Sequence, residues 1–425
     1  MKNFLNAVLE TRTIKDSFVT SLGTAINGLL GLFFYAVLGR FLGPLSYGIF
    51  SVSVDSMTLL KDIGTTGIDT GIVRFVGKYA PLDRQKALKF LKLSLELKIG
   101  IWILIFILGW LSMPFIALTI LGKPELLFPL RLSLFGVGTG LLFSLSTYAV
   151  QSFQKFWVWS GLNILSNLGR LITIFVLVAL GMLTVNSSLL NYMIWPLIGF
   201  FISLLFLPNF FKVKNEFEVG REFLNYNKWI ALFTLIAAVS SRLDIYISAT
   251  LLPLYQVGIY AAATQLASIV PQVVFAFGAV VAPKLASFDS DTKAFIYLKK
   301  LQALVIIIAS VGIIIGIPLA KYFVLPFFYG KEYLGAIIPF SILLVTQAIF
   351  LISIPVHTAV IYYFAYPKLF VYISLGHLLI MIVGGYYLIS SFGIVGAAVT
   401  ALIGNIFNFA VPFIWTLRKF RNLRK

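Results

Sequence analysis

Long apolar segments recur along the whole chain, and they constrain its fold more than any other feature. The 425 residues have a mean hydropathy of +0.99, and 60% are hydrophobic while 11% are charged. A soluble globular protein has roughly 45–50% apolar and about 25% charged residues. Backbone that faces lipid must satisfy its own hydrogen bonds, as a helix of about 20 apolar residues does. The sequence therefore predicts an all-α integral membrane protein, and not a β-barrel with alternating polar and apolar residues.

We predict twelve transmembrane helices, six in each half of the chain. Their expected ranges are 18–40, 46–76, 94–118, 127–152, 156–180, 188–210, 226–250, 256–282, 300–320, 336–362, 366–388 and 393–417. The polar segment 209–226 at the chain midpoint is the longest connection between them. We therefore expect an N-terminal six-helix lobe over 1–210, a cytoplasmic linker over 211–225 and a C-terminal six-helix lobe over 226–425.

The two halves resemble each other at a constant offset of 210 positions. Leu42 falls on Leu252, and Gly48-Ile49-Phe50 falls on Gly258-Ile259-Tyr260. Because six is an even number, the second half enters the membrane from the same side as the first. The lobes would then be parallel repeats related by a pseudo-two-fold axis along the membrane normal. In transporters of this kind the substrate site lies between the halves, and rocking gives alternating access.

The distribution of positive charge predicts the orientation in the membrane. The net charge of +18 comes from short clusters between apolar runs, which a membrane topology explains better than a nucleic-acid partner does. The odd-numbered loops hold few Lys and Arg: Arg40, Lys123, Arg131, Lys321 and Lys331. The positive-inside rule then places both termini in the cytoplasm, in a multi-pass protein of the cytoplasmic membrane. We expect no cleaved signal peptide, because the N-terminus has no compact apolar region with a cleavage site.

Residues 83–93 carry a basic amphipathic pattern. Leu88 and Leu91 lie opposite Arg84, Lys86, Lys89 and Lys92. This pattern favours an interfacial helix on anionic headgroups over an ordinary basic loop.

Charged residues inside the predicted helices are the informative positions, because a charge at a helix centre costs roughly 2.5–3.5 kcal/mol on insertion scales. In 46–76, Lys61 and Asp62 fall near mid-depth and Arg74 near the cytoplasmic edge. Asp55, Asp62 and Asp69 are seven residues apart and share one helix face, so they are candidates for binding a coupling ion or proton. The alternative is that these charges neutralise one another in local pairs.

Predicted helix 156–180 carries one polar stripe, Ser160, Asn163, Asn167 and Arg170, at i, i+3, i+7 and i+10. The stripe predicts either the wall of a cavity or polar contacts to a neighbouring helix.

At the offset of 210, Asn167 falls on His377 and Thr147 falls on His357. Either histidine is a candidate proton carrier, because the unperturbed pKa of His is about 6.5. The alternative is a histidine that is only hydrogen-bonded.

Predicted helix 226–250 contains Arg242 and Asp244, which point to different faces. An Arg side chain suits phosphate because its planar fork donates two hydrogen bonds. We expect Lys61, Arg170 and Arg242, with Arg74, to form a cationic chamber for the phosphate of a lipid-linked saccharide. Asn163, Asn167 and Asp244 are its expected polar neighbours.

Motifs of soluble enzymes are missing from the chain. There is no P-loop, no HExxH and no dinucleotide fingerprint, and the chain has no Cys and two His. We therefore expect no enzyme activity, no catalytic residues, no metal site and no cofactor.

Four segments resemble the polysaccharide-exporter flippases of the multidrug/oligosaccharidyl-lipid/polysaccharide exporter superfamily. They are LGRFLGPLSYGIFS (38–51), DIGTTGIDTGIVRFV (62–76), RLDIYISATLLPLYQVGIYAAATQL (242–266) and FGIVGAAVTALIGNIF (392–407). The resemblance implies a MATE-like fold of two six-helix lobes around a central cavity that moves polyprenyl-linked sugars across the cytoplasmic membrane. It specifies neither the sugar nor the binding residues.

Three functions are compatible with these observations. The first is a flippase for a polyprenyl-(pyro)phosphate-linked saccharide, with glycan-assembly enzymes as candidate partners. The second is a cation-coupled MATE-type drug exporter that uses Asp55, Asp62 and Asp69. The third is a membrane scaffold for glycan-assembly enzymes, which would not need the intramembrane Arg and Lys. A shared fold permits more than one of these functions, so the site must decide between them.

Overall fold

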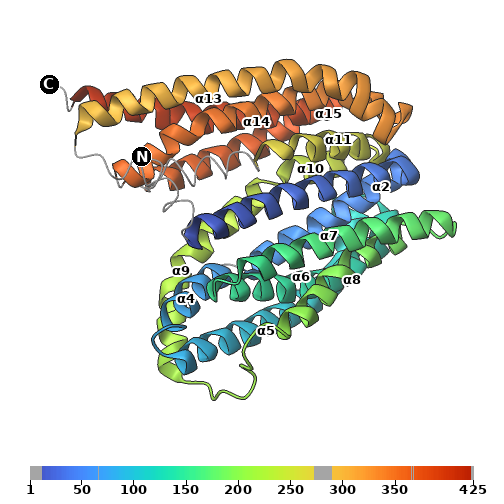
Figure 1. Cartoon of the computed structure of the whole chain (residues 1–425). Helices are drawn as coiled ribbons and strands as arrows, with labels where there is room; N and C mark the ends of the chain where they lie inside the picture. Colours follow the sequence, from blue (N-terminus) through green and yellow to red (C-terminus); the bar gives the residue numbers. More distant parts are fainter. Residues whose placement is uncertain (1–11, 66, 272–289, 365, 367, 423–425) are drawn as a thin grey trace. The chain divides into compact units, whose positions relative to one another are not determined.

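The computed structural model describes residues 12–422 apart from 66, 272–289, 365 and 367, and the regular elements in this part of the chain are all helical (Figure 1). Among the described residues, eight helices are long and apolar enough to cross a membrane. The predicted all-α membrane class is therefore confirmed.

The helices of the first half follow the predicted segments in order. They are α2 (Arg12–Thr65), α3 (Ile68–Gly71), a π-helical turn (Ile72–Val76), α4 (Gly77–Tyr79), α5 (Arg84–Phe115), a second π-helical turn (Ile116–Ile120), a 3₁₀ turn (Pro124–Leu126), α6 (Leu127–Ser152), α7 (Phe156–Ala179) and α8 (Val185–Leu204).

The helices of the second half begin with α9, which follows the connection at the chain midpoint. They are α9 (Phe217–Ser240), α10 (Leu243–Leu251), α11 (Leu254–Ala267), α13 (Asp291–Leu319), a π-helical segment (Ala320–Tyr329), a 3₁₀ turn (Lys331–Ala336), α14 (Ile337–Thr358), a π-helical turn (Ala359–Tyr363) and α15 (Lys368–Asn422). Of the predicted helix 256–282, the part over 272–282 lies outside the described residues.

Two of the long helices each consist of two helices joined at a glycine. In α2 the joint is Gly43 (φ 71°), which is followed by Pro44, and in α15 it is Gly393 (φ 58°). Glycine enters this left-handed region without the steric penalty of a Cβ atom. Gly43 falls between the predicted helices 18–40 and 46–76, and Gly393 is the first residue of the predicted helix 393–417.

Two predicted helices are wrong as continuous elements. The segment 46–76 breaks after Thr65, and Gly67 there has a left-handed φ of 76°. The segment 226–250 breaks after Ser240, so that Arg242 lies in the turn before α10 and not inside a helix. Both breaks occur at short runs of glycine, serine or threonine. These residues favour turns, and the apolar pattern continues on either side of them.

The secondary structure repeats with the offset found in the sequence. Helix α6 begins at Leu127 and α14 begins at Ile337, 210 positions later. A π-helical segment and then a 3₁₀ turn precede both helices. The offset of 210 positions thus relates irregular local structure as well as a few identical residues.

The described contacts divide the chain into two compact units. Unit 1 consists of residues 1–34 and 49–238, and unit 2 consists of 35–48 and 239–425. The short segment 35–48, although it lies early in the chain, is thus part of unit 2. These bounds differ from those of the predicted lobes, 1–210 and 226–425, which stay a prediction.

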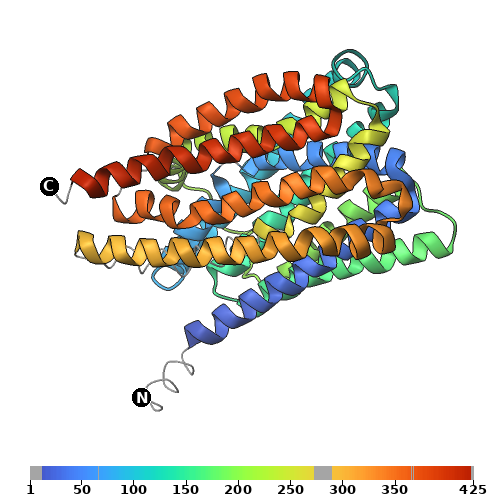
Figure 2. The ribbon, with the colours of Figure 1, turned by 90° about the horizontal axis from the view of Figure 1, so that it is seen from above.

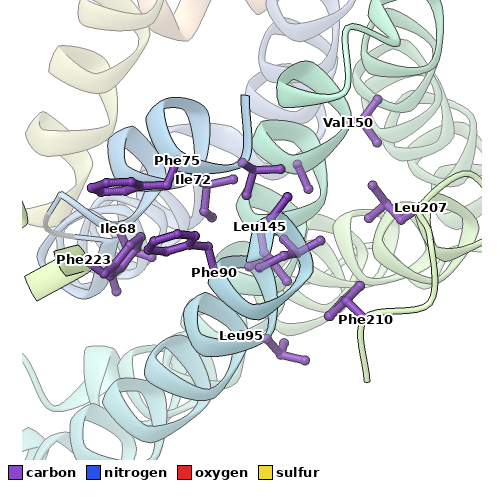
Figure 3. Packing of buried hydrophobic residues seen from close by; sticks show 14 of the residues in the cluster. Ile68, Ile72, Phe75, Phe90, Leu95, Leu145, Val150, Leu207, Phe210 and Phe223 are labelled. Atoms are coloured by element: carbon purple, nitrogen blue, oxygen red, sulfur yellow. The ribbon is translucent and has the colours of Figure 1, made fainter. Parts of the chain in front are cut away.

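The core of unit 1 contains the first turns of α5 (Figure 3). The rings of Phe75 and Phe90 stack with centroids 4.6 Å apart, and Phe223 of α9 packs against both. Ala87, Phe90 and Leu91 are fully buried in this cluster. The interfacial helix predicted over 83–93 is therefore wrong, because its apolar face packs against protein and not lipid.

The basic face of the same turns binds the segment that leads into α9. The Lys89 ammonium pairs with Glu216, Lys92 donates to the Val213 carbonyl oxygen at 2.8 Å, and Lys86 lies 3.1 Å from Glu222. These lysines fix the midpoint connection to unit 1.

In unit 2, α14 packs between α13 and α15 (Figures 1 and 2). Buried residues of the three helices form its core, among them Ala294, Val305, Leu351, Ile354 and Phe420. This packing leaves α10 and α11 to contact α15 and α14, around the cavity described below.

Candidate functional site

A charged cluster lies in unit 1, where the end of α2 meets α5 and α6. The Lys61 ammonium lies 3.2 Å from the Asp62 carboxylate, and about a third of each side chain is exposed. The Lys61 stem lies over Gly140 of α6, where a Cβ atom would come within 3.0 Å of it. Lys61 and Asp62 thus form a local ion pair, which is the alternative that the sequence analysis gave for these charges.

Lys98 of α5 is the most deeply buried charge of this cluster. Its side chain is 0% exposed, and its ammonium lies 2.5 Å from the Asp69 carboxylate. It also donates to the Ser144 hydroxyl and to the Leu141 carbonyl oxygen of α6, the latter at 3.3 Å. One lysine therefore connects α5, α6 and the segment that follows the break in α2.

The three acids predicted as an ion-binding set have separate partners. Asp62 pairs with Lys61, Asp69 pairs with Lys98, and Asp55 accepts a hydrogen bond from Ser51 at 3.4 Å. Within the described part of the chain, no group of three or more His, Cys, Asp or Glu side chains could hold a metal ion. Asp62 and Asp69 thus lie in one charged cluster, each beside its own lysine, whereas Asp55 bonds within α2.

The break after Thr65 packs against α9. A Cβ atom on Gly67 would lie 3.0 Å from the Asn227 carbonyl oxygen, and one on Gly71 would lie 2.6 Å from the Asn227 amide nitrogen. Arg74 follows this break, is exposed, and places its guanidinium 4.1 Å from the ring centroid of Tyr226. Arg74 is thus held at the surface of unit 1 by an aromatic ring.

The polar stripe of α7 faces α2. Ser160 donates to the Val19 carbonyl oxygen at 3.4 Å, and the Asn167 amide donates to Asn27 Oδ1 at 2.6 Å. Asn163 instead donates to Trp159 of its own helix at 2.8 Å. Ser160 and Asn167 therefore fit the second interpretation of the stripe, polar contacts to a neighbouring helix.

Arg170 joins α7 to α8. It donates from Nε and Nη2 to the Tyr192 carbonyl oxygen, at 3.2 and 2.9 Å, and from Nη1 to Asn167 Oδ1 at 3.2 Å. Its guanidinium carbon lies 3.8 Å from the Tyr192 ring centroid. The planar fork expected to bind phosphate is used here to bind a backbone carbonyl.

We expect Arg170→Ala to lower the free energy of unfolding by about 1.5–3 kcal/mol, the range for hydrogen bonds to charged groups. Arg170→Lys should recover only part of this, because a single ammonium cannot reproduce the fork. Thermal unfolding of purified variants measures both changes. An alanine variant as stable as the parent that fails to bind a polyprenyl phosphate would assign Arg170 to the substrate instead.

Unit 2 contains a cavity of about 370 Å³, lined by both polar and apolar residues, next to the turn between α9 and α10. Asp244 lines it, and the Asp244 carboxylate accepts a hydrogen bond from the Tyr260 hydroxyl at 2.6 Å. Helices α14 and α15 add Thr346, Gln347, His377, Asn405 and Asn408 to the polar wall, and Ser240, Ser241 and Thr264 complete it. Arg242 lies in the turn itself, two residues before Asp244.

His377 lines this cavity, but His357 does not. The His377 imidazole packs over Gly404, where a Cβ atom would lie 2.7 Å from Nε2. His357 Nε2 lies 3.0 Å from the Asn408 carbonyl oxygen, and its ring packs against Phe370. His357 therefore fits the hydrogen-bonded alternative, whereas His377 and Asp244 share a cavity with space for a small ligand.

The segment 35–48 crosses α11 in a reciprocal backbone contact within unit 2. A Cβ atom on Gly48 would lie 2.1 Å from the Leu254 carbonyl oxygen, and one on Gly258 would lie 1.9 Å from the Pro44 carbonyl oxygen. Pro44 and Leu254 are themselves 210 positions apart, as are Gly48 and Gly258. The two copies of the repeat thus use the same two positions against each other.

Hydrogen bonds hold the same segment on unit 2. The Tyr333 hydroxyl donates to the Gly39 carbonyl oxygen at 2.8 Å, and Arg40 donates to the Phe327 carbonyl oxygen. The buried Tyr47 ring meets those of Tyr329 and Tyr333 edge to face.

Sequence reasoning missed Lys98 and the glycine contact. Lys98 falls inside the predicted helix 94–118, so the rule applied to Lys61 would have found it. The offset identified Gly48 and Gly258 as equivalent positions but gave no sign that they touch. No motif or spacing in the sequence singled out Thr346 and Gln347 as cavity residues. The expectation that Lys61, Arg74, Arg170 and Arg242 form one phosphate site stays a prediction.

Comparisons with known proteins identify the fold first. A multidrug resistance MATE family transporter of the MOP superfamily, in an inward-facing conformation, matches with a TM-score of 0.79 at 12% identity, covering 94% of this chain and 95% of that one. The lipid II flippase MurJ, in an inward closed conformation, matches with a TM-score of 0.74 at 16% identity, covering 95% and 89%. The fold is therefore MATE-like.

The sequence then identifies the family. The model of the polysaccharide biosynthesis protein family matches residues 13–289, more than half of the chain. The chain belongs to this family, and the resemblance noted in its sequence is confirmed. Lipid II flippase MurJ of Bacillus subtilis (strain 168) is 25% identical over 118 residues, which are 28% of this chain and 22% of that protein. The matched part thus spans less than a quarter of that relative.

Proposed function

We propose that this protein is a flippase that moves a polyprenyl-(pyro)phosphate-linked saccharide across the cytoplasmic membrane by alternating access. The observation that carries the proposal is the family of the chain, together with its likeness in sequence and fold to a lipid II flippase. These relatives indicate a transporter rather than an enzyme. Multi-pass insertion is supported by the eight membrane-capable helices.

The architecture that we propose has twelve transmembrane helices in two lobes, related by a pseudo-two-fold axis along the membrane normal. Helices α2 and α15 each contain two helices, and α9–α10 and α11 lie between the other spans in the chain. The reciprocal contact of Gly48 and Gly258 supports the axis, because equivalent positions meet equivalent positions across a two-fold axis. The charge distribution supports cytoplasmic termini.

The pairing of the acids favours a flippase over a cation-coupled drug exporter. Of the three acids that the drug-exporter function would use, Asp62 and Asp69 are already compensated by Lys61 and Lys98. The cavity in unit 2 is the better place for a coupling ion or proton, since Asp244 and His377 both line it. Arg242, in the turn beside this cavity, is the strongest candidate for contact with the substrate phosphate.

The function is tested by transport in proteoliposomes loaded with a fluorescent polyprenyl-pyrophosphate saccharide. We expect the purified chain to expose this lipid to a membrane-impermeant quencher or enzyme, and not to export a cationic dye. Dye export without lipid translocation would establish the drug-exporter function. If the chain neither translocates the lipid nor exports the dye, and glycan-assembly enzymes stay bound to the purified chain, its function is that of a membrane scaffold.

Arg242 supplies a sharper test of the site. Arg242→Ala should weaken binding of the pyrophosphate lipid by about tenfold or more, and Arg242→Lys should recover part of it. Arg221→Ala on the exposed face of α9 removes the same charge and should leave binding unchanged. Arg242 could instead serve only to neutralise Asp244. In that case the double variant Arg242→Gln with Asp244→Asn should restore the lipid binding that either single change loses.

A further inference from the structure

Three connections of unit 1 enclose a second cavity, of about 470 Å³. Its walls are Arg84 at the start of α5, Phe153 and Lys155 between α6 and α7, and Phe206 and Leu207 after α8. None of these residues belongs to the charged cluster of unit 1 or to the cavity of unit 2. The function proposed above therefore leaves this cavity unexplained.

The two basic residues in its wall retain donors that no neighbour uses. Lys155 donates once, to the Phe206 carbonyl oxygen at 2.7 Å. The Arg84 guanidinium has no hydrogen-bond or ion-pair partner among the residues that the structure describes, and it is exposed. The positive potential of this cavity is thus available to a ligand.

The neighbouring acids are bound elsewhere. The Asp83 carboxylate accepts from the Lys86 backbone N–H at 3.0 Å, where it caps α5. Glu222 and Glu216 pair with Lys86 and Lys89. Each of these three acids thus has a partner other than Arg84 and Lys155.

A helix N-terminus adds to the positive potential. Helix α7 has 24 residues and begins directly after Lys155, with no side chain capping its first N–H groups. Unpaired N–H groups at a helix start attract anions, and phosphate above all. The cavity therefore combines two cations with an uncapped helix start.

Large exposed apolar residues lie within two positions of the wall residues in the sequence. Leu82, Trp157 and Leu205 are 77%, 73% and 83% exposed, although each is a large hydrophobic residue. Trp is enriched where a membrane protein meets the headgroup region. Basic pockets between helices at this level bind the headgroups of anionic lipids.

We propose that this cavity binds the phosphate of an anionic phospholipid, with Arg84, Lys155 and the start of α7 at the phosphate and Trp157 and Leu205 beside the acyl chains. The site is separate from the substrate site proposed above. It uses the bilayer lipid itself as ligand, whether or not the protein moves a lipid-linked saccharide.

The probe is phosphatidylglycerol, and the measurement is native mass spectrometry of the full chain released from detergent, with phosphatidylcholine as the neutral comparison. We expect the parent protein to retain phosphatidylglycerol preferentially. Arg84→Gln and Lys155→Gln should each weaken retention by about fivefold, the effect of roughly one basic residue at an anionic surface. The matched control is Lys78→Gln, which removes an exposed charge outside the cavity wall and should change retention less than twofold.

Arg84→Gln is the decisive variant, because the Arg84 side chain makes no bond whose loss could unfold the protein. Unchanged retention in this variant, at an unchanged melting temperature, would overturn the proposal. An equal loss in Lys78→Gln would overturn it too, by showing that diffuse surface charge attracts the lipid. Displacement of the lipid by millimolar inorganic phosphate would assign the cavity to a free anion instead. None of these outcomes depends on transport, so they are independent of the proposed flippase activity.

Discussion

Replacing Lys98 with methionine is expected to lower the free energy of unfolding by about 3–5 kcal/mol, the cost of removing one partner of a buried ion pair. The Lys98 side chain is 0% exposed and fills the space between Asp69 and α6. Methionine keeps most of its length, so the loss reports the uncompensated Asp69 carboxylate rather than a cavity. Chemical denaturation of the purified protein in detergent measures it.

The matched control is Lys61→Met. The Lys61–Asp62 pair joins consecutive residues of α2 in the same unit and is about a third exposed, so water compensates the charge that remains. Lys61→Met should therefore lower the free energy of unfolding by less than about 1 kcal/mol.

A double-mutant cycle then separates pairing from packing. Adding Asp69→Asn to Lys98→Met should restore most of the stability, because no buried charge is left unpaired. If the double variant is as unstable as the sum of the two single ones, Lys98 acts through Ser144 and the Leu141 carbonyl oxygen, and the ion pair is incidental.

Gly258→Ala is expected to destabilise the protein by about 1–3 kcal/mol or more, the cost of overpacking. The new Cβ atom would lie 1.9 Å from the Pro44 carbonyl oxygen, and backbone atoms cannot turn away as the end of a side chain can. The segment 35–48 must then shift from α11, which weakens the contacts of Tyr47 and Tyr333. Thermal unfolding in matched detergent measures the loss.

Gly312→Ala provides the control for this effect. Gly312 lies inside α13 with no atom within 4 Å of its added Cβ, so alanine there should be neutral or stabilising by up to about 1 kcal/mol. In the pair Gly48→Ala and Gly258→Ala, the double variant should lose less than the sum of the singles, since the first change already separates the backbones. Equal losses of stability in Gly312→Ala and Gly258→Ala would mean that helix propensity, and not the close backbone contact, determines the effect of Gly258→Ala.

The sequence predicted long apolar elements well, because the rule behind them is local. The range 127–152 is that of α6, and 156–180 differs from α7 by one residue. The breaks near Gly67 and Arg242 were missed because they interrupt hydrogen bonding while the hydrophobic pattern continues. The amphipathic pattern over 83–93 gave a real apolar face, but periodicity cannot tell whether protein or lipid covers such a face.

The candidate site was only partly predictable for a related reason. Asn167 and Arg170 share a face and do bond each other, as their spacing of three indicates. Asp69 and Lys98 are 29 residues apart and meet only because α5 packs beside the end of α2. Asp244 and His377 line one cavity from different helices, and no spacing in the sequence relates them. Local geometry was therefore readable from the sequence, whereas partners brought by packing were not.

The contact between Gly48 and Gly258 bears on how the two halves of the proposed repeat can differ. In a symmetric dimer of half-length chains, each substitution at such a contact would occur twice, once on either side of the axis. In the fused chain each occurs once, so the two copies can diverge separately. Pro44 and Leu254 differ in their side chains, and the contact uses only their carbonyl oxygens. Both equivalent positions hold glycine, and a Cβ atom on either would collide with the backbone of the other segment.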